Sequence, residues 1–322
     1  MSEERTRKSA QRMKKPARFT LAHSASLAYA ACMYFPTADI SISPFLPPLA
    51  AFVISFFTSM GGVSGAFLLL PLQVSLGYVS PSVSATNHLF NVIATPGGVW
   101  RYYREGRLLT PLVECTVLGC LPGVLIGAFI RLEWLADGAR FKTFAALILL
   151  FLALRLLIGL RRSGSGQKAP GAAHPILLDS SFRSFRFSFQ DREYACDLRA
   201  VFLLTLLIGL AGGIYGIGGG SILAPLLAAG FRLPVHVTAG PTLLCTFATS
   251  AGGVLIYLLL APLYPGLTVI PDWTLGLLFG LGGLAGMYAG ARCQKYIPAR
   301  PIRLLLAIVI LGTAAGWLFP PR

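Results

Sequence analysis

GLAGGIYGIGGGSILAPLLAAGF, residues 209–231, is an apolar stretch in which seven of the first twelve residues are glycine. Each glycine inside a helix costs about 0.8–1 kcal/mol relative to alanine, so a continuous helix is an unfavourable structure for this stretch. At membrane depth the alternative is a broken helix, whose backbone N–H groups and half-helix dipoles line a cavity. The stretch therefore predicts a discontinuous helix that forms a site for a small anion.

A weaker copy of this stretch, FFTSMGGVSGAFLLLPLQVSLGY, lies at residues 56–78. We align the copies by setting Pro71 against Pro225. The alignment pairs Gly62 with Gly216, Ser64 with Gly218 and Gly65 with Gly219. In both halves a polar run, a Gly-Gly pair and a tyrosine follow, so the chain is predicted to contain an internal repeat.

The composition is that of a membrane protein. The 322 residues are 55% hydrophobic and 12% charged, whereas roughly 25% of the residues in soluble domains are charged. No Asp, Glu, Lys or Arg occurs from Ile40 through Trp100, which is long enough for two or three membrane spans. A large soluble core is therefore excluded, and the lipid bilayer is the expected environment.

The net charge of +15 does not indicate a nucleic-acid partner. The basic residues lie between apolar runs, without an aromatic and basic binding module, so the positive-inside rule explains them. The six cysteines lie mostly within apolar spans and form no CxxC pair, which predicts small buried side chains and neither a disulfide framework nor a metal site.

The N-terminal part divides into two segments. Residues 1–18 carry seven Lys or Arg and predict a basic tail, which places the N-terminus in the cytoplasm. Residues 19–35 predict an extra, uncleaved N-terminal helix. A signal peptide and an interfacial helix are the alternatives for this segment.

The rest of the chain predicts an all-α polytopic fold of two inverted repeats, 46–161 and 199–319, each a broken Gly-rich hairpin followed by three transmembrane helices. The segment 82–100 is expected to make one crossing of the membrane. Between the repeats, the insertion 162–198 contains alternating phenylalanines that predict a β-hairpin. Its basic residues place it in the cytoplasm, opposite the base-free loop 261–271; a regulatory or partner-binding role stays open.

The segments GIYGIGGGSILAPLL and LPVHVTAGPTLLCTFATSAGGVLIY resemble the second-half signature of the sulfite exporter TauE/SafE family of membrane permeases. The resemblance covers residues 46–160 and 199–319. It is weaker in the first half, where residues 61–65 read GGVSG instead of GIGGG. The resemblance implies a cell-membrane permease that exports or exchanges small, mostly sulfur-containing anions, such as sulfite or organosulfonates.

Neutral groups are the expected ligands of the anion, because no charged side chain lies near the breaks. The candidates are Gly62, Ser64, Gly65, Gly216, Gly218, Gly219, Gly220 and Ser221 at the breaks, and Thr86, Asn87, His88 and Thr242 just after the hairpins. Close helix packing is the alternative for the glycines, and hydrogen bonds between helices are the alternative for the polar side chains. Three successive glycines favour the anion site, since a packing face needs a small residue only at every fourth position.

His88 and Glu114 are the candidates for proton coupling in the first repeat, since ionisable groups inside a membrane are usually functional. For Glu114, the alternative is an ion pair with Arg107 near the interface. No nucleotide loop is present, because Gly220 is followed by Ser-Ile and not by Lys-Ser or Lys-Thr. Without a nucleophile–base pair or a metal cluster, neither enzymatic activity nor a cofactor is expected.

These observations predict a secondary transporter that moves a small anion by alternating access, and the resemblance implies that the direction is export. An anion channel of the same architecture and a membrane assembly subunit without transport activity are the alternatives. The sequence does not specify an oligomeric state.

Overall fold

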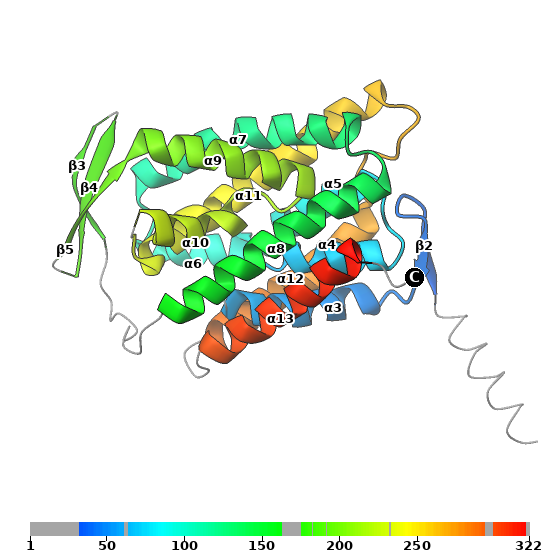
Figure 1. Cartoon of the computed structure of the whole chain (residues 1–322), viewed down its shortest axis with the longest axis horizontal. Coiled ribbons are helices and arrows are strands. Elements are labelled where there is room, and N and C mark those ends of the chain that lie inside the picture. Colours follow the sequence, from blue (N-terminus) through cyan, green and yellow to red (C-terminus); the bar gives the residue numbers. More distant parts are fainter. Residues whose placement is uncertain are drawn as a thin grey trace, which may run out of the picture.

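The computed structural model describes residues 32–60, 64–162, 175–181, 183–190, 192–231, 233–293 and 299–319. It is a bundle of helices with a small β-sheet at each end (Figure 1). The helices of the first half are α3 (Leu46–Met60), α4 (Ala66–Ser75), α5 (Ser82–Ala94), α6 (Pro96–Arg104), α7 (Thr110–Glu133) and α8 (Gly138–Arg162). Those of the second half are α9 (Leu198–Tyr215), α10 (Gly220–Gly230), α11 (Val235–Leu260), the short 3-10 helix η1 (Ala261–Leu263), α12 (Trp273–Cys293) and α13 (Ala299–Leu318).

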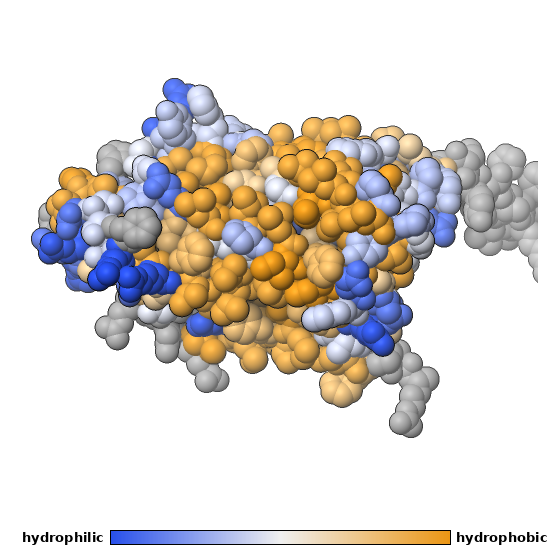
Figure 2. All heavy atoms as spheres, turned by 90° about the horizontal axis from the view of Figure 1, so that it is seen from above, coloured by the Kyte–Doolittle hydropathy of each residue, from blue (hydrophilic) through white to orange (hydrophobic). Residues whose placement is uncertain are grey.

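Five helices, α7, α8, α9, α11 and α12, contain segments long and apolar enough to cross a membrane. Their outward-facing side chains are apolar too, for example Leu118 and Leu207, which are 63% and 67% exposed. Figure 2 shows hydrophobic residues over most of the visible body, with hydrophilic residues gathered toward its two ends. The predicted class, a mainly helical multi-pass membrane protein, is confirmed.

The sequence predicts an extra helix over residues 19–35, but the last three residues of this segment form a strand. Met33–Phe35 is a strand, β1, that pairs antiparallel with β2 (Ile40–Ile42). Pro36 cannot continue a helix, and Asp39 adopts a positive φ of 53° that closes the turn. The Tyr34 hydroxyl donates a hydrogen bond to Asp39 Oδ1 at 2.8 Å. Residues 19–31 lie outside the described residues.

The insertion between the repeats contains three strands instead of the two of a hairpin. They are β3 (Ile176–Ser180), β4 (Ser184–Phe189) and β5 (Arg192–Asp197), in the order β3-β4-β5. The three phenylalanines of β4 are buried on one face, and Phe187 stacks on Tyr194 of β5. The strand β3 is exposed along its whole length, so its sequence lacks the alternation that marks β4.

The expected crossing over 82–100 is two helices, α5 and α6, which meet at Thr95. Pro96 has no backbone N–H and therefore cannot donate the next hydrogen bond of α5. The Asn91 carbonyl accepts both the Thr95 N–H, at 3.0 Å, and the Thr95 hydroxyl, at 2.7 Å. The chain then continues through α6 to the start of α7.

The two halves of the chain pack mainly against each other. Helix α3 of the first half packs along α12 of the second, and α9 of the second packs along α7 of the first. The last helices of the two halves, α8 and α13, also pack together, and α5 contacts α11. Each half therefore obtains its principal packing surface from the other.

Glycines make the α7–α9 contact close. A Cβ at Gly123 or Gly127 would overlap the α9 backbone, and a Cβ at Gly209 or Gly213 would overlap the α7 backbone. These residues recur every fourth position, as expected for close helix packing in membranes. Gly209 and Gly213 therefore serve close helix packing, and the break itself begins only at Gly216.

Candidate functional site

The candidate site lies where two helix breaks meet the polar helix α5. In the first break, Ser64 and Gly65 precede α4; Gly62 lies outside the described residues. In the second, Gly216 and Gly218 have positive φ angles of 84° and 65°, a conformation that glycine adopts without steric cost. The second break therefore depends on glycine at two positions.

Asn91 of α5 connects the two breaks. The Ser64 hydroxyl donates to Asn91 Oδ1 at 3.0 Å, and Asn91 Nδ2 donates to the Ile217 carbonyl at 2.9 Å. Ser64 also accepts a hydrogen bond from the Ala66 N–H at 3.3 Å, close to the start of α4. One buried amide thus holds both breaks at a fixed distance from each other.

Further polar contacts cross the same region. Asn87 Nδ2 donates to the Ala66 carbonyl at 3.0 Å, and the Tyr215 hydroxyl donates to the Phe67 carbonyl at 2.8 Å. Ser84 donates to the Ile214 carbonyl at 2.9 Å. Asn87 Oδ1 is buried without a hydrogen-bond partner among the described residues. This atom is therefore an unsatisfied polar group beside the first break.

The glycines of the second break pack tightly against α7 and α11. A Cβ at Gly218 would lie 2.7 Å from Ser250 Oγ, and one at Gly219 would lie 3.0 Å from Cys120 Cβ. At Gly220 it would overlap the Thr242 carbonyl. The Gly219 N–H donates to Thr249 Oγ1 at 3.3 Å, while Ser250 Oγ is buried without a partner in the described part of the chain. Close packing and a polar environment therefore coexist at these glycines.

A comparison with protein families matches residues 48–316 to the family described as sulfite exporter TauE/SafE. The chain belongs to this family. The match spans both breaks and every helix of the candidate site that the structure describes.

Several relatives of this TauE/SafE-family chain carry the name of probable membrane transporter protein. ORF9 of Sinorhizobium sp. is 27% identical over 277 residues, which cover 85% of this chain and 91% of that protein. YjnA of Bacillus subtilis is 23% identical and covers 82% of this chain and 95% of its own length. YunE of the same organism is 21% identical over 60% of this chain and 64% of its own length. No solved structure matches the chain at a comparable significance.

Two of the predicted ligands of the TauE/SafE candidate site already have hydrogen-bond partners. Thr242 Oγ1 donates to the Thr238 carbonyl of its own helix at 2.9 Å, as mid-helix threonines often do. Thr86 Oγ1 contacts the Tyr78 hydroxyl at 2.7 Å and accepts from the Asp272 N–H at 2.9 Å. Thr86 therefore joins a cluster at the N-terminus of α12. The side chain of Ser221 lies outside what the structure describes.

The two predicted proton carriers have different surroundings. His88 is fully buried, and neither ring nitrogen has a hydrogen-bond partner among the described residues. Its ring centroid lies 6.2 Å from that of Tyr257, and Gly253 leaves room for it, since a Cβ there would lie 2.7 Å from His88 Nε2. Glu114 instead is exposed on α7. Only His88 therefore faces the interior.

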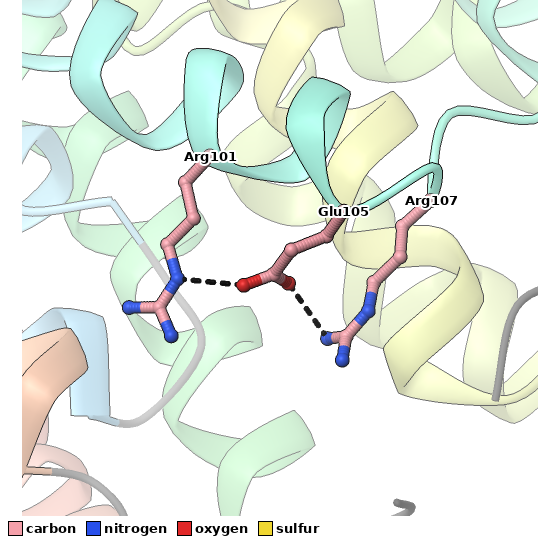
Figure 3. Close-up of polar contacts among 3 residues, drawn as sticks. All are labelled: Arg101, Glu105 and Arg107. Atoms are coloured by element: carbon pink, nitrogen blue, oxygen red, sulfur yellow. Dashed lines mark hydrogen bonds and ion pairs between the residues drawn. The ribbon is translucent and has the colours of Figure 1, made fainter. Parts of the chain in front are cut away.

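Arg107 forms an ion pair with Glu105. The alternative interpretation predicts Glu114 as the partner of Arg107. The Glu105 carboxylate lies 2.9 Å from Arg101 Nε and 3.4 Å from Arg107 Nη1 (Figure 3). All three side chains are partly exposed, so this ion-pair network contributes little to the free energy of folding. It marks a polar end of the bundle.

Sequence reasoning missed Asn91, whose contacts connect the breaks. A signal for it exists, because Asn87 and Asn91 are four residues apart and therefore lie on one face of a helix. Ser84 and Tyr215 were missed too, because each one bonds a backbone carbonyl far away in the sequence.

Proposed function

We propose that this chain is a secondary transporter of small sulfur-containing oxyanions, such as sulfite or organosulfonates, and that it exports them across the cell membrane by alternating access. The observation that carries the proposal is the Asn91 bridge between the two breaks. A polar ligand bound at this bridge contacts backbone from both halves of the chain at once. Relative motion of the halves then changes its access from one side to the other.

The inverted-repeat arrangement is part of the proposal. Helix α4 begins directly after Gly65 and α10 begins directly after Gly219. Each half-helix carries a proline at its sixth position, Pro71 or Pro225. The first helix of each half packs along a helix of the other half, α3 on α12 and α9 on α7, and this reciprocal packing supports a pseudo-two-fold relation between the halves.

The chemistry of the region supports a weakly held anion. Several buried polar groups have no partner in the described chain. Among those near the breaks, Ser250 Oγ and an imidazole nitrogen of His88 can donate a hydrogen bond, whereas Asn87 Oδ1 can only accept one. A hydroxyl, an imidazole N–H and the amides of a half-helix N-terminus donate hydrogen bonds to oxyanion oxygens. Neutral donors bind an anion without a salt bridge, so the bound anion is released readily, as a transport cycle requires.

Transport by the purified full-length chain in liposomes tests the function. The assay compares sulfite, sulfate, thiosulfate and an organosulfonate, with and without a pH gradient. We expect saturable uptake of sulfite that is accelerated by unlabelled sulfite on the other side. Flux that does not saturate and shows no exchange would indicate a channel, and absence of flux for the whole panel would contradict transport of these anions.

The orientation gives a first prediction. The strand β3 and the loop after η1 lie at opposite ends of the bundle (Figure 1), and the positive-inside rule assigns β3 to the cytoplasm. In a cysteine-free background we expect Ser180→Cys to react only with reagents on the cytoplasmic side and Gly266→Cys only from outside. Both positions are exposed. Labelling of Ser180→Cys from outside would overturn the proposed orientation.

Proton coupling gives a second prediction. We expect His88→Gln to flatten the pH dependence of sulfite transport, because His88 is the buried titratable side chain of α5 and has no fixed hydrogen-bond partner. Initial rates between pH 5 and 8 measure the effect. Glu114→Gln is the matched control and should leave the profile unchanged. An unchanged profile in His88→Gln would remove this histidine from the coupling mechanism.

A further inference from the structure

Arg131 is a buried positive charge at the C-terminal end of α7. Its side chain is 0% exposed, and within the described chain it and Asp272 are the only buried members of the Asp, Glu, Lys and Arg set. Asp272 has an evident structural role, since its Oδ1 accepts from the Leu275 N–H and caps α12. The position of Arg131 needs a different explanation.

The neighbours of Arg131 do not neutralise its charge. Nη2 donates to the Val79 carbonyl at 3.2 Å, Nη1 donates to the Leu135 carbonyl, and the guanidinium carbon lies 3.8 Å from the centroid of the Phe141 ring. Nε is buried without a partner, and no carboxylate of the described residues lies within ion-pair distance. A buried charge without a counter-ion is unfavourable, so arginines in membrane spans usually serve a function.

Arg131 is connected to the polar helix α5. Val79, whose carbonyl it binds, follows Tyr78, and the Tyr78 hydroxyl contacts Thr86 of α5. On α7, the flanking residues Ala128 and Leu132 pack in one cluster with Tyr257, the aromatic neighbour of His88. Arg131 therefore lies beside the same layer of α5, α7 and α11 that contains the unpartnered imidazole.

We propose that Arg131 is an oxyanion-binding residue, the fixed positive charge that the transported anion contacts at the end of the bundle opposite Arg101 and Arg107. The inference rests on the proposed transport of anions. The 24 residues of α7 separate the two ends by about 36 Å. An oxyanion accepts two parallel hydrogen bonds from a guanidinium, so it replaces the carbonyls of Val79 and Leu135 as the acceptor.

The experiment measures the half-saturating concentration of sulfite for the full-length chain in liposomes. We expect Arg131→Met, which keeps most of the volume but removes the charge, to raise this concentration at least about tenfold, as the loss of a hydrogen bond to a charged group does. Arg131→Lys keeps the charge and should fall between the wild type and Arg131→Met. The matched control is Arg155→Met, since Arg155 also lies near an aromatic ring, 5.8 Å from the centroid of Phe151, but on α8. It should leave the value unchanged.

A purely structural clamp gives the opposite pattern. Arg131→Met would then lower the thermal stability in detergent but leave the half-saturating concentration of the remaining folded protein at the wild-type value, and that result would overturn the proposal. If Arg131→Met does not fold, Arg131→Gln decides, because it keeps a donor for a carbonyl and lacks the charge. Wild-type protein without saturable sulfite transport would overturn the proposed function as well, whereas active wild type with unaffected neutral variants would overturn the role of Arg131 alone.

Discussion

Gly216→Ala is expected to lower the free energy of unfolding by about 3 kcal/mol, from left-handed backbone strain of about 1–2 kcal/mol and overpacking of about 1–3 kcal/mol. Gly216 has a φ of 84°, and a Cβ there would overlap the Ser84 carbonyl and lie 2.8 Å from Ser84 Cα. The backbone of α5 cannot move away without disturbing the Asn91 bridge. Thermal unfolding of the purified protein in detergent measures the loss.

The matched control is Gly230→Ala at the other end of α10. No atom lies within 4 Å of the position that a Cβ would occupy at Gly230, and its φ is not positive. This variant should therefore be as stable as the wild type. Equal stability of the two variants would show that the break tolerates a side chain at Gly216 and that its conformation differs from the one described.

Asn91→Ala is expected to reduce sulfite transport by more than about tenfold and to lower the free energy of unfolding by about 2–3 kcal/mol. The substitution removes the hydrogen bond that Asn91 donates to the Ile217 carbonyl and the acceptor of the Ser64 hydroxyl. A lost hydrogen bond costs about 0.5–1.5 kcal/mol, and a buried group left unsatisfied costs about 1–3 kcal/mol. The two breaks then lose their common attachment to α5. Transport rates per folded molecule and thermal unfolding measure the two effects separately.

Thr95→Val is the control for this prediction. Thr95 is buried one turn after Asn91, but its hydroxyl bonds the carbonyl of its own helix, so its removal should cost at most about 1 kcal/mol. A transport rate in Asn91→Ala equal to that of Thr95→Val would contradict a role for the bridge in the transport cycle.

The positions of the half-helices could be predicted from the sequence because their signals are local. Setting Pro71 against Pro225 pairs Gly65 with Gly219, and these residues directly precede α4 and α10 in the structure. Glycine favours a break through its own backbone freedom, and proline excludes certain hydrogen bonds regardless of the fold. Such signals do not require knowledge of which helix lies next to which.

The candidate site could be predicted only in part, because its contacts join distant segments. Ser64 and Asn87 were identified as polar residues near a break, but their link to the second break depends on Asn91 and Ile217. Glu114 is exposed on α7, and hydropathy alone does not show which face of this helix points inward. Arg131 was overlooked for a related reason, since its burial results from Phe141 and two loop carbonyls and not from its neighbours on α7.

The helices of each half pack mainly against helices of the other half, and this arrangement has a consequence for biosynthesis. Gly282, Gly286 and Gly290 of α12 lie so close to the backbone of α3 that a Cβ on any of them would overlap it, and α12 is the main packing partner of α3 among the described residues. A ribosome releases α3 long before it synthesises α12, so α3 must remain in the membrane with its contact face uncovered during most of translation. Assembly of this protein is therefore largely post-insertional, and a nascent chain that stops before α12 presents an unprotected helix face to the quality-control proteases of the membrane.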